Sequence, residues 1–186
     1  MDTYPSERVP TARHTIYVLS PDVQTPTGGI KVLYRHVDIL NAHGYQAFIL
    51  HRNPGFRCTW FENTTPVAYM PHVQPSPDDL FVVPEVFGPD LADIAPGNKK
   101  IIYNQSGSLT FQGYPIDGSG DRTPYLDPDV VATFAISENV VDYVHYVFPN
   151  MPVYRMRWSI DNSLFSLVGS SRKKRQICFM PRRRPE

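Results

Sequence analysis

The chain has 186 residues, of which 41% are hydrophobic and 19% charged, with 18 basic and 18 acidic side chains. This composition is typical of one globular domain, or of one domain with a fragment attached, and it excludes a collagen-like, disulfide-rich or disordered chain. The balanced charge conceals a basic end, because residues 172–186 hold seven Lys and Arg against one Glu. The remaining body is acidic, which excludes an ordinary nucleic-acid-binding surface there.

The sequence carries no pattern of a targeting or membrane segment. Residues 1–14 are charged and interrupted by proline, so they lack the apolar stretch of a signal peptide. No apolar run approaches the length that a transmembrane helix needs. Cys58 and Cys178 lie far apart without a partner motif, and we expect both to be free thiols in a reducing compartment.

The first elements predicted along the chain are a strand, a helix and a second strand. A short apolar strand covers 15–19 and is followed by a polar loop. Gly28-Gly29 then begins a helix, Gly44 ends it, and the second strand covers 46–50. One face of this helix carries the apolar and aromatic residues Ile30, Leu33, Tyr34, Val37 and Leu40.

Further strands are predicted near 80–83, 100–103, 131–136 and 153–158. The other elements expected are a weak strand near 67–70, a short helix that begins at Gly88-Pro89 and ends at 95–97, a long loop over 112–129, and a helix that Ser137 caps and that runs to about Tyr146. Strands that alternate with helices, several of them uniformly apolar, predict an α/β fold: a Rossmann-like, mainly parallel sheet with helices on both faces.

Gly28 and Gly29 form the strongest local signal for a binding site. Two glycines at a helix N-terminus let a ligand approach the backbone, and the free N–H groups and the helix dipole favour an anion such as phosphate. The alternative interpretation is a tight turn between strand and helix. The full G-x-G-x-x-G pattern is absent, which disfavours a nicotinamide cofactor.

Several polar residues directly follow predicted strands. In an open parallel sheet, ligands bind outside the carboxyl ends of the strands, so these side chains are candidates for contacting a sugar or a phosphate. The alternative is helix capping and loop hydrogen bonding, which is the preferred interpretation for the serine. The candidates are Glu85, Asn104, Gln105, Ser137 and Glu138.

The sequence does not predict a metal site. Asp127-Pro128-Asp129 has the D-x-D form of metal-dependent glycosyltransferases, but it follows no strong strand and is interpreted as structural. The six histidines show no paired ligand spacing. No nucleophile–base pair is apparent either, so the catalytic residues remain unassigned.

In this order the segments resemble the N-terminal domain of GT-B-fold retaining bacterial glycosyltransferases of the family 4-like group. The resemblance covers about residues 15–180. Besides the Gly28-Gly29 unit, it is carried by the segments QAFIL, FVVPEVFG, KKIIYNQSG, ATFAISENVVDYV and RWSIDNSLF. Many members have a histidine after the fourth strand, where this chain has Asn104-Gln105.

The resemblance implies half of a two-domain enzyme. In this family the N-terminal domain mainly binds the acceptor, a second Rossmann-like domain binds the donor nucleotide, and transfer is retaining and metal-independent, with no cofactor besides the nucleotide-sugar co-substrate. It divides the chain into a polar leader (1–14), the N-terminal glycosyltransferase domain (15–170), and a linker with the first strand of a missing C-terminal domain (171–186). We therefore expect this chain alone to be inactive.

The leading expectation is a glycosyltransferase that moves a sugar from a nucleotide sugar to a glycan, lipid or other acceptor, for example in polysaccharide biosynthesis. The candidate donor- and substrate-binding residues are Gly28, Gly29, Glu85, Asn104, Gln105, Ser137 and Glu138. Two alternatives remain open: a non-catalytic module that binds a glycan or a partner, and a different α/β nucleotide-binding enzyme. We expect a cytoplasmic protein, with peripheral attachment to the inner membrane and oligomerisation left open.

Overall fold

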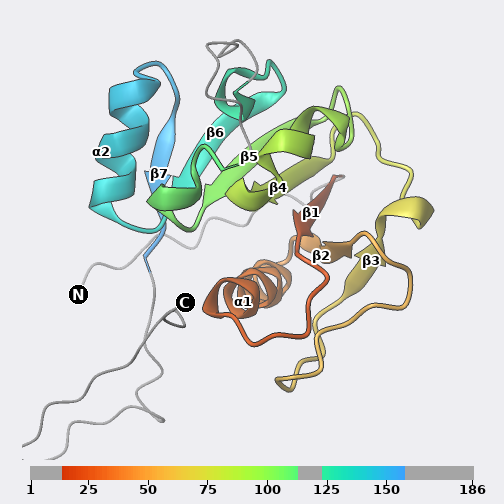
Figure 1. The fold of residues 1–186 in the computed structure, drawn as a ribbon. Helices are drawn as coiled ribbons and strands as arrows, with labels where there is room; N and C mark the ends of the chain where they lie inside the picture. Colours follow the sequence, from red (N-terminus) through yellow and green to blue (C-terminus); the bar gives the residue numbers. More distant parts are fainter. Residues whose placement is uncertain (1–13, 113–122, 158–186) are drawn as a thin grey trace, which may run out of the picture.

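The computed structural model describes residues 14–112 and 123–157. Its centre is a seven-stranded sheet in the order β3-β2-β1-β4-β5-β6-β7, and every neighbouring pair is parallel (Figure 1). The strands are β1 (Thr15–Leu19), β2 (Gln46–His51), β3 (Val67–Tyr69), β4 (Leu80–Pro84), β5 (Lys99–Asn104), β6 (Val130–Ala135) and β7 (Val153–Arg155). The predicted α/β, Rossmann-like parallel sheet is confirmed.

Two α-helices and several 3₁₀ segments connect these strands. They are α1 (Gly28–Ala42), η1 (Met70–His72), η2 (Glu85–Asp93), η3 (Gly107–Leu109), η5 (Pro124–Leu126) and α2 (Glu138–Val147). Helix α1 ends as its sequence predicts, because Gly44 adopts a φ of 85°. The N–H groups of Gly44 and Tyr45 then donate back to the carbonyls of Asn41 and Leu40, which closes the helix end in a Schellman motif.

The sheet separates two hydrophobic cores. Strand side chains alternate between its faces, so Ile16 and Val18 of β1 lie in one core and Leu19 in the other. Helix α1 and the segment over 56–61 cover the first core, whereas η2, η5 and α2 cover the second. The two helices therefore pack on opposite faces of the sheet. In Figure 1, α1 lies near β1 and β2, and α2 lies beside β7.

The helix after β4 differs from the prediction. A helix with Pro89 at its first position was expected, but η2 begins at Glu85, directly after the strand, and Pro89 lies inside it. Proline has no N–H to donate and disfavours an α-helical interior, and the segment is a 3₁₀ helix. The predicted turn at its end is present, because Ala95 and Gly97 both have positive φ angles, 43° and 82°.

The remaining differences are small or lie outside the described residues. Strand β7 covers Val153–Arg155, shorter than the predicted strand over 153–158. The predicted loop over 112–129 contains the turn η5. The polar leader, except for His14, and the predicted linker over 171–186 lie outside the described residues. No helix within 14–112 or 123–157 is long and apolar enough to cross a membrane.

Candidate functional site

The candidate residues lie at one edge of the sheet because all its strands are parallel. Their carboxyl ends meet at this edge, and the order of the sheet reverses between β1 and β4. The connections that follow these two strands leave in opposite directions. Open α/β sheets form a ligand-binding crevice at such a point, between the two connections. The segment 20–27 follows β1 and leads to α1, and Glu85 directly follows β4.

Gln105 joins three segments of the chain at this point. Its backbone N–H donates to Oε2 of Glu85 at 2.9 Å, and its side-chain Nε2 donates to the carbonyl oxygen of Gly29 at 3.2 Å. The residues that follow β4 and β5 are therefore bonded to each other and to the start of α1. Three of the candidate residues, Gly29, Glu85 and Gln105, thus form one cluster, which we call the switch-point cluster.

Glu85 is a buried carboxyl group, with only 3% of its surface exposed. Burial raises the pKa of Glu85 to about 7, although the backbone N–H groups of Gln105, Glu85 and Ser106 favour the charged form. The residue can therefore carry or release a proton near neutral pH. Its visible structural effect is to hold the backbone of Gln105.

The two glycines at the start of α1 have different surroundings. A Cβ atom at Gly29 would lie 2.6 Å from Oε1 of Gln105, whereas a Cβ atom at Gly28 would have no atom within 4 Å. Gly29 therefore allows the amide of Gln105 to approach the helix backbone. Thr27 precedes the helix without a side-chain hydrogen bond to it, so the first turn of α1 is not capped by its own N-cap residue.

Asn104 lies apart from the switch-point cluster. It is the last residue of β5 and is fully buried, and its Nδ2 donates to Oγ1 of Thr110 at 2.8 Å and to the hydroxyl of Tyr125 at 2.9 Å. Consecutive strand residues point to opposite faces, so Asn104 and Gln105 face different surroundings. Asn104 ties the connection after β5 to η5.

Ser137 and Glu138 stand at the start of α2. The hydroxyl oxygen of Ser137 accepts a hydrogen bond from the N–H of Val140 at 3.2 Å, which confirms its predicted role as the cap. Glu138 is exposed and forms an ion pair with Arg155 at 3.2 Å. Ser137 also lines an open groove of about 500 Å³ that it shares with Gln105. The described residues that line it are Gln105, Ser106, Gly107, Ser108, Ile136, Ser137, Asn139, Val140 and Tyr143.

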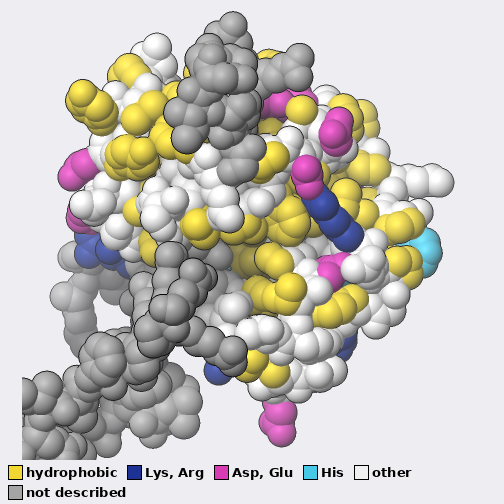
Figure 2. Space-filling model, viewed as in Figure 1, with side chains coloured by type: hydrophobic (Ala, Val, Ile, Leu, Met, Phe, Trp, Pro, Cys, Tyr) yellow, Lys and Arg dark blue, Asp and Glu magenta, His cyan; other side chains and the backbone are white. Residues whose placement is uncertain are grey.

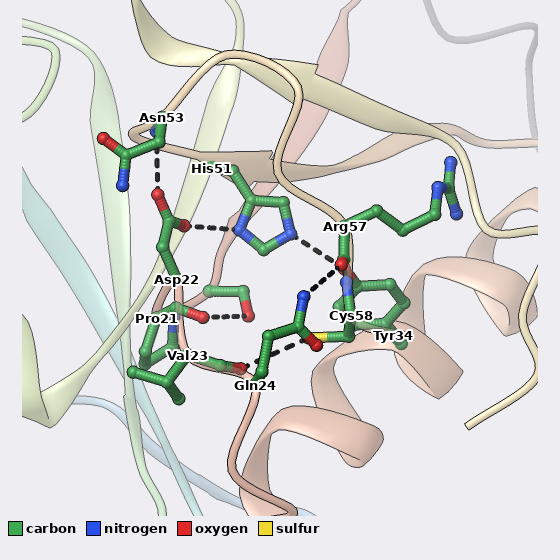
Figure 3. Close-up of polar contacts among 10 residues, drawn as sticks. Pro21, Asp22, Val23, Gln24, Tyr34, His51, Asn53, Arg57 and Cys58 are labelled. Carbon is green, nitrogen blue, oxygen red and sulfur yellow. Dashed lines mark hydrogen bonds and ion pairs between the residues drawn. The ribbon is translucent and has the colours of Figure 1, made fainter. Parts of the chain in front are cut away.

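A buried polar network beside α1 was missed by the sequence analysis (Figure 3). Nδ1 of His51 lies 2.6 Å from Oδ1 of Asp22, and Nε2 lies 2.8 Å from the hydroxyl of Tyr34. The other oxygen of Asp22 accepts from the N–H of Asn53, and the hydroxyl oxygen of Tyr34 accepts from the N–H of Cys58. His51 directly follows the predicted strand over 46–50, so the rule that selected Glu85 would have selected it too. Asp22 lies three residues after the predicted strand over 15–19, and the rule would not have selected it.

The network fixes the loop that leads to Gly28. Burial lowers the pKa of His51, more than the neighbouring Asp22 raises it, so the imidazole is neutral at pH 7. A carboxylate only accepts, so Nδ1 carries the proton and Nε2 accepts from Tyr34. Gln24 adds bonds from the same loop to the carbonyl of Arg57 and the N–H of Thr59.

The acidic pair Asp127 and Asp129 has a structural role, as its sequence context indicated. Asp129 forms an ion pair with the buried Lys100 at 2.9 Å and accepts from the N–H of Gly97, at the amino end of β5. Oδ1 of Asp127 accepts from the N–H of Asp129. Within the described residues, no three His, Cys, Asp or Glu side chains are grouped so that they could hold a metal ion.

Neither known family models nor curated proteins give a match for this chain.

Proposed function

We propose that this chain supplies the acceptor-side half of a retaining, metal-independent glycosyltransferase, which moves a sugar from a nucleotide sugar to a glycan, lipid or other acceptor. The proposal starts from the resemblance of its motifs to GT-B-fold enzymes. The observation that supports it best is the switch-point cluster, in which Gln105 contacts both Glu85 and Gly29. Polar groups that converge at a switch point are the usual ligand-binding arrangement in this kind of sheet.

Each residue of the cluster has a role in this proposal. The uncapped first turn of α1 presents backbone N–H groups and the positive end of the helix dipole, which suit a phosphate of the donor. The amide of Gln105 offers a donor and an acceptor to sugar hydroxyls. Glu85 positions Gln105 through its backbone. The donor's nucleotide would be held by a second Rossmann-like domain, as the resemblance implies.

The rate enhancement would come from positioning and electrostatics. The reaction breaks the bond between the anomeric carbon and the diphosphate and forms a bond to the acceptor oxygen, whose proton passes to the departing diphosphate or to water. Holding the two substrates in the right geometry lowers the activation free energy by several kcal/mol. Stabilising the charge on the departing diphosphate lowers it further. No side chain of this chain is assigned to the chemical step itself.

A non-catalytic glycan-binding module is the second candidate. It is favoured by the groove beside the cluster, which is open and lined by uncharged residues. Such a groove can hold a neutral glycan without any diphosphate. This candidate predicts sugar binding without turnover by the full gene product.

The test is a transfer assay on the full gene product with a panel of nucleotide sugars, which measures the release of nucleoside diphosphate. Replacing Gln105 by Ala should lower kcat/KM at least about tenfold, or about 1.4 kcal/mol, because its amide contacts would be lost. The G29A variant should act in the same direction, because its Cβ atom displaces the amide of Gln105.

The matched control is Q46A. Gln46 is an exposed glutamine at the amino end of β2, on the opposite edge of the sheet, so this variant should keep wild-type turnover. If no nucleotide sugar is consumed under any condition, the proposal fails. If Q105A and Q46A turn over at the same rate, the assignment of the switch-point cluster as the substrate site is wrong.

A further inference from the structure

The groove between η3 and the start of α2 has an uncharged lining. Its polar lining residues include Gln105 and Asn139, which carry amides, and three serines, and no Lys, Arg, His, Asp or Glu of the described residues lines it. Two of these hydroxyls, on Ser106 and Ser108, lie 3.0 Å apart on one wall. Amides and hydroxyls are paired donors and acceptors, which match the hydroxyls of a sugar, whereas a phosphate is held best by cations.

One aromatic ring completes this lining. Tyr143 is 38% exposed and stands one helical turn after Asn139, so the ring and the amide are neighbours on the same face of α2. Phe111 packs against the Tyr143 ring in an edge-to-face geometry, with centroids 6.0 Å apart, which restricts the ring's orientation. Figure 2 shows hydrophobic and uncharged side chains over much of α2, with acidic side chains at its outer edge and basic side chains near its lower end.

We propose that this groove binds one neutral pyranose ring, with its C–H face against Tyr143 and its hydroxyls bonded to Asn139, Gln105 and the serines. The electron-rich face of an aromatic ring attracts polarised C–H groups, and the planar amide beside it suits a pair of adjacent hydroxyls. The volume of about 500 Å³ is ample for one ring. Identifying this ring as part of the sugar acceptor rests on the function proposed above.

Gln105 connects the groove to the switch-point cluster. Gln105 lines the groove, and its side chain is bonded to Gly29 at the start of α1. A sugar in the groove would therefore lie next to the place where a donor phosphate would bind. This position fits an acceptor sugar, which must come close to the transferred group without carrying a phosphate of its own.

The experiment is a titration of the ¹⁵N-labelled 186-residue chain with methyl α-glucoside, mannoside, galactoside and rhamnoside, followed by NMR. We expect at least one of them to bind with a Kd of about 1–10 mM, as is usual for a small ligand in an open groove. The amide signals of Ser106–Ser108 and Asn139–Tyr143 should shift. Saturation transfer should be strongest at the ring C–H groups of the sugar.

Three variants test the role of the aromatic ring. Y143A should weaken binding about tenfold, while Y143F should bind within about twofold of wild type because stacking does not need the hydroxyl. The matched control is Y146A on the same helix, since Tyr146 is 87% exposed and does not line the groove. N139A should also weaken binding. Asn139 is exposed, so this substitution leaves the core intact.

Other outcomes overturn the inference. It is wrong if inorganic phosphate shifts the same amides more strongly than the sugars do, if no sugar of the panel shifts them, or if Y143A and Y146A bind equally. The transfer assay separates this result from the proposed function. Sugar binding in the groove without turnover by the full gene product would refute the glycosyltransferase and leave the groove assignment standing. Turnover with an unchanged acceptor KM in Y143A would refute only the identification of the bound sugar as the acceptor.

Discussion

Glu85 shows how one buried side chain can make stability depend on pH. Its carboxyl group ends a buried strand and lies beneath the backbone of Gln105, and burial raises its pKa from 4.5 to about 7. In the unfolded chain the group ionises near 4.5, so between these values only the folded state holds the proton. The stability that this proton contributes is complete below about pH 4.5 and is lost as pH rises through about 7.

We predict that E85Q removes this dependence. The wild-type free energy of unfolding should fall by up to about 3 kcal/mol between pH 5 and pH 8 because of this group, and E85Q should lack that fall. The glutamine oxygen can still accept from the N–H of Gln105. Urea unfolding at several pH values measures the difference, with E138Q as the control because Glu138 is exposed. Parallel profiles for wild type and E85Q would contradict the prediction.

At the scale of elements, an ion pair fixes the start of β5 against the start of β6. Lys100 is completely buried in the sheet, and its Nζ donates to Oδ2 of Asp129 at 2.9 Å and to the carbonyl of Asn98 at 3.3 Å. Asp129 directly precedes β6, and its pKa is lowered by the hydrogen bond from Lys100 and by the N–H of Gly97. Removing one partner would leave a charge in the core without compensation.

D129N should therefore destabilise the fold by up to about 3 kcal/mol, at the lower end of the range for breaking a buried pair, because Lys100 is fully buried whereas Asp129 is 27% exposed. The matched control is D90N, because Asp90 pairs with Arg52 at 2.7 Å on the surface and exposed pairs contribute at most about 1 kcal/mol. The double variant K100M/D129N should recover most of the loss, since no unpaired charge remains. Urea unfolding at pH 7 compares the three, and an effect of D129N as small as that of D90N would show that water reaches Lys100.

At the scale of the whole molecule, the candidate site is an open groove on one edge of a single sheet. Among residues 14–112 and 123–157 no cationic side chain lines it, and solvent has direct access to it, so contacts to a diphosphate are screened by water. In the proposed function, a second domain would hold the donor nucleotide.

We predict that the 186-residue chain binds nucleotide sugars no tighter than about millimolar, equivalent to about 4 kcal/mol, and transfers no sugar. Calorimetric titration with a panel of nucleotide sugars measures the binding, and a transfer assay measures the turnover. Micromolar binding or turnover by the 186-residue chain would show that it holds a complete donor site.

The local elements were largely determined by the sequence. Uniformly apolar runs gave the buried strands, the spacing from Ile30 to Leu40 gave one face of α1, and Gly44 and Ser137 mark a helix end and a helix start through backbone geometry and a side-chain bond. These signals are local, because each depends on residues that are neighbours along the chain. The parallel order followed from the alternation of strands and helices.

Which polar residues meet was decided by the tertiary structure alone. Asn104 and Gln105 looked equivalent in sequence, yet one is buried against Tyr125 and the other reaches Gly29, 76 residues away in the chain. The pairing of Asp22 with His51 likewise depends on β1 and β2 lying side by side in register. A sequence shows that side chains alternate along a strand, but the sheet order and the packing of each face determine which of them share a site.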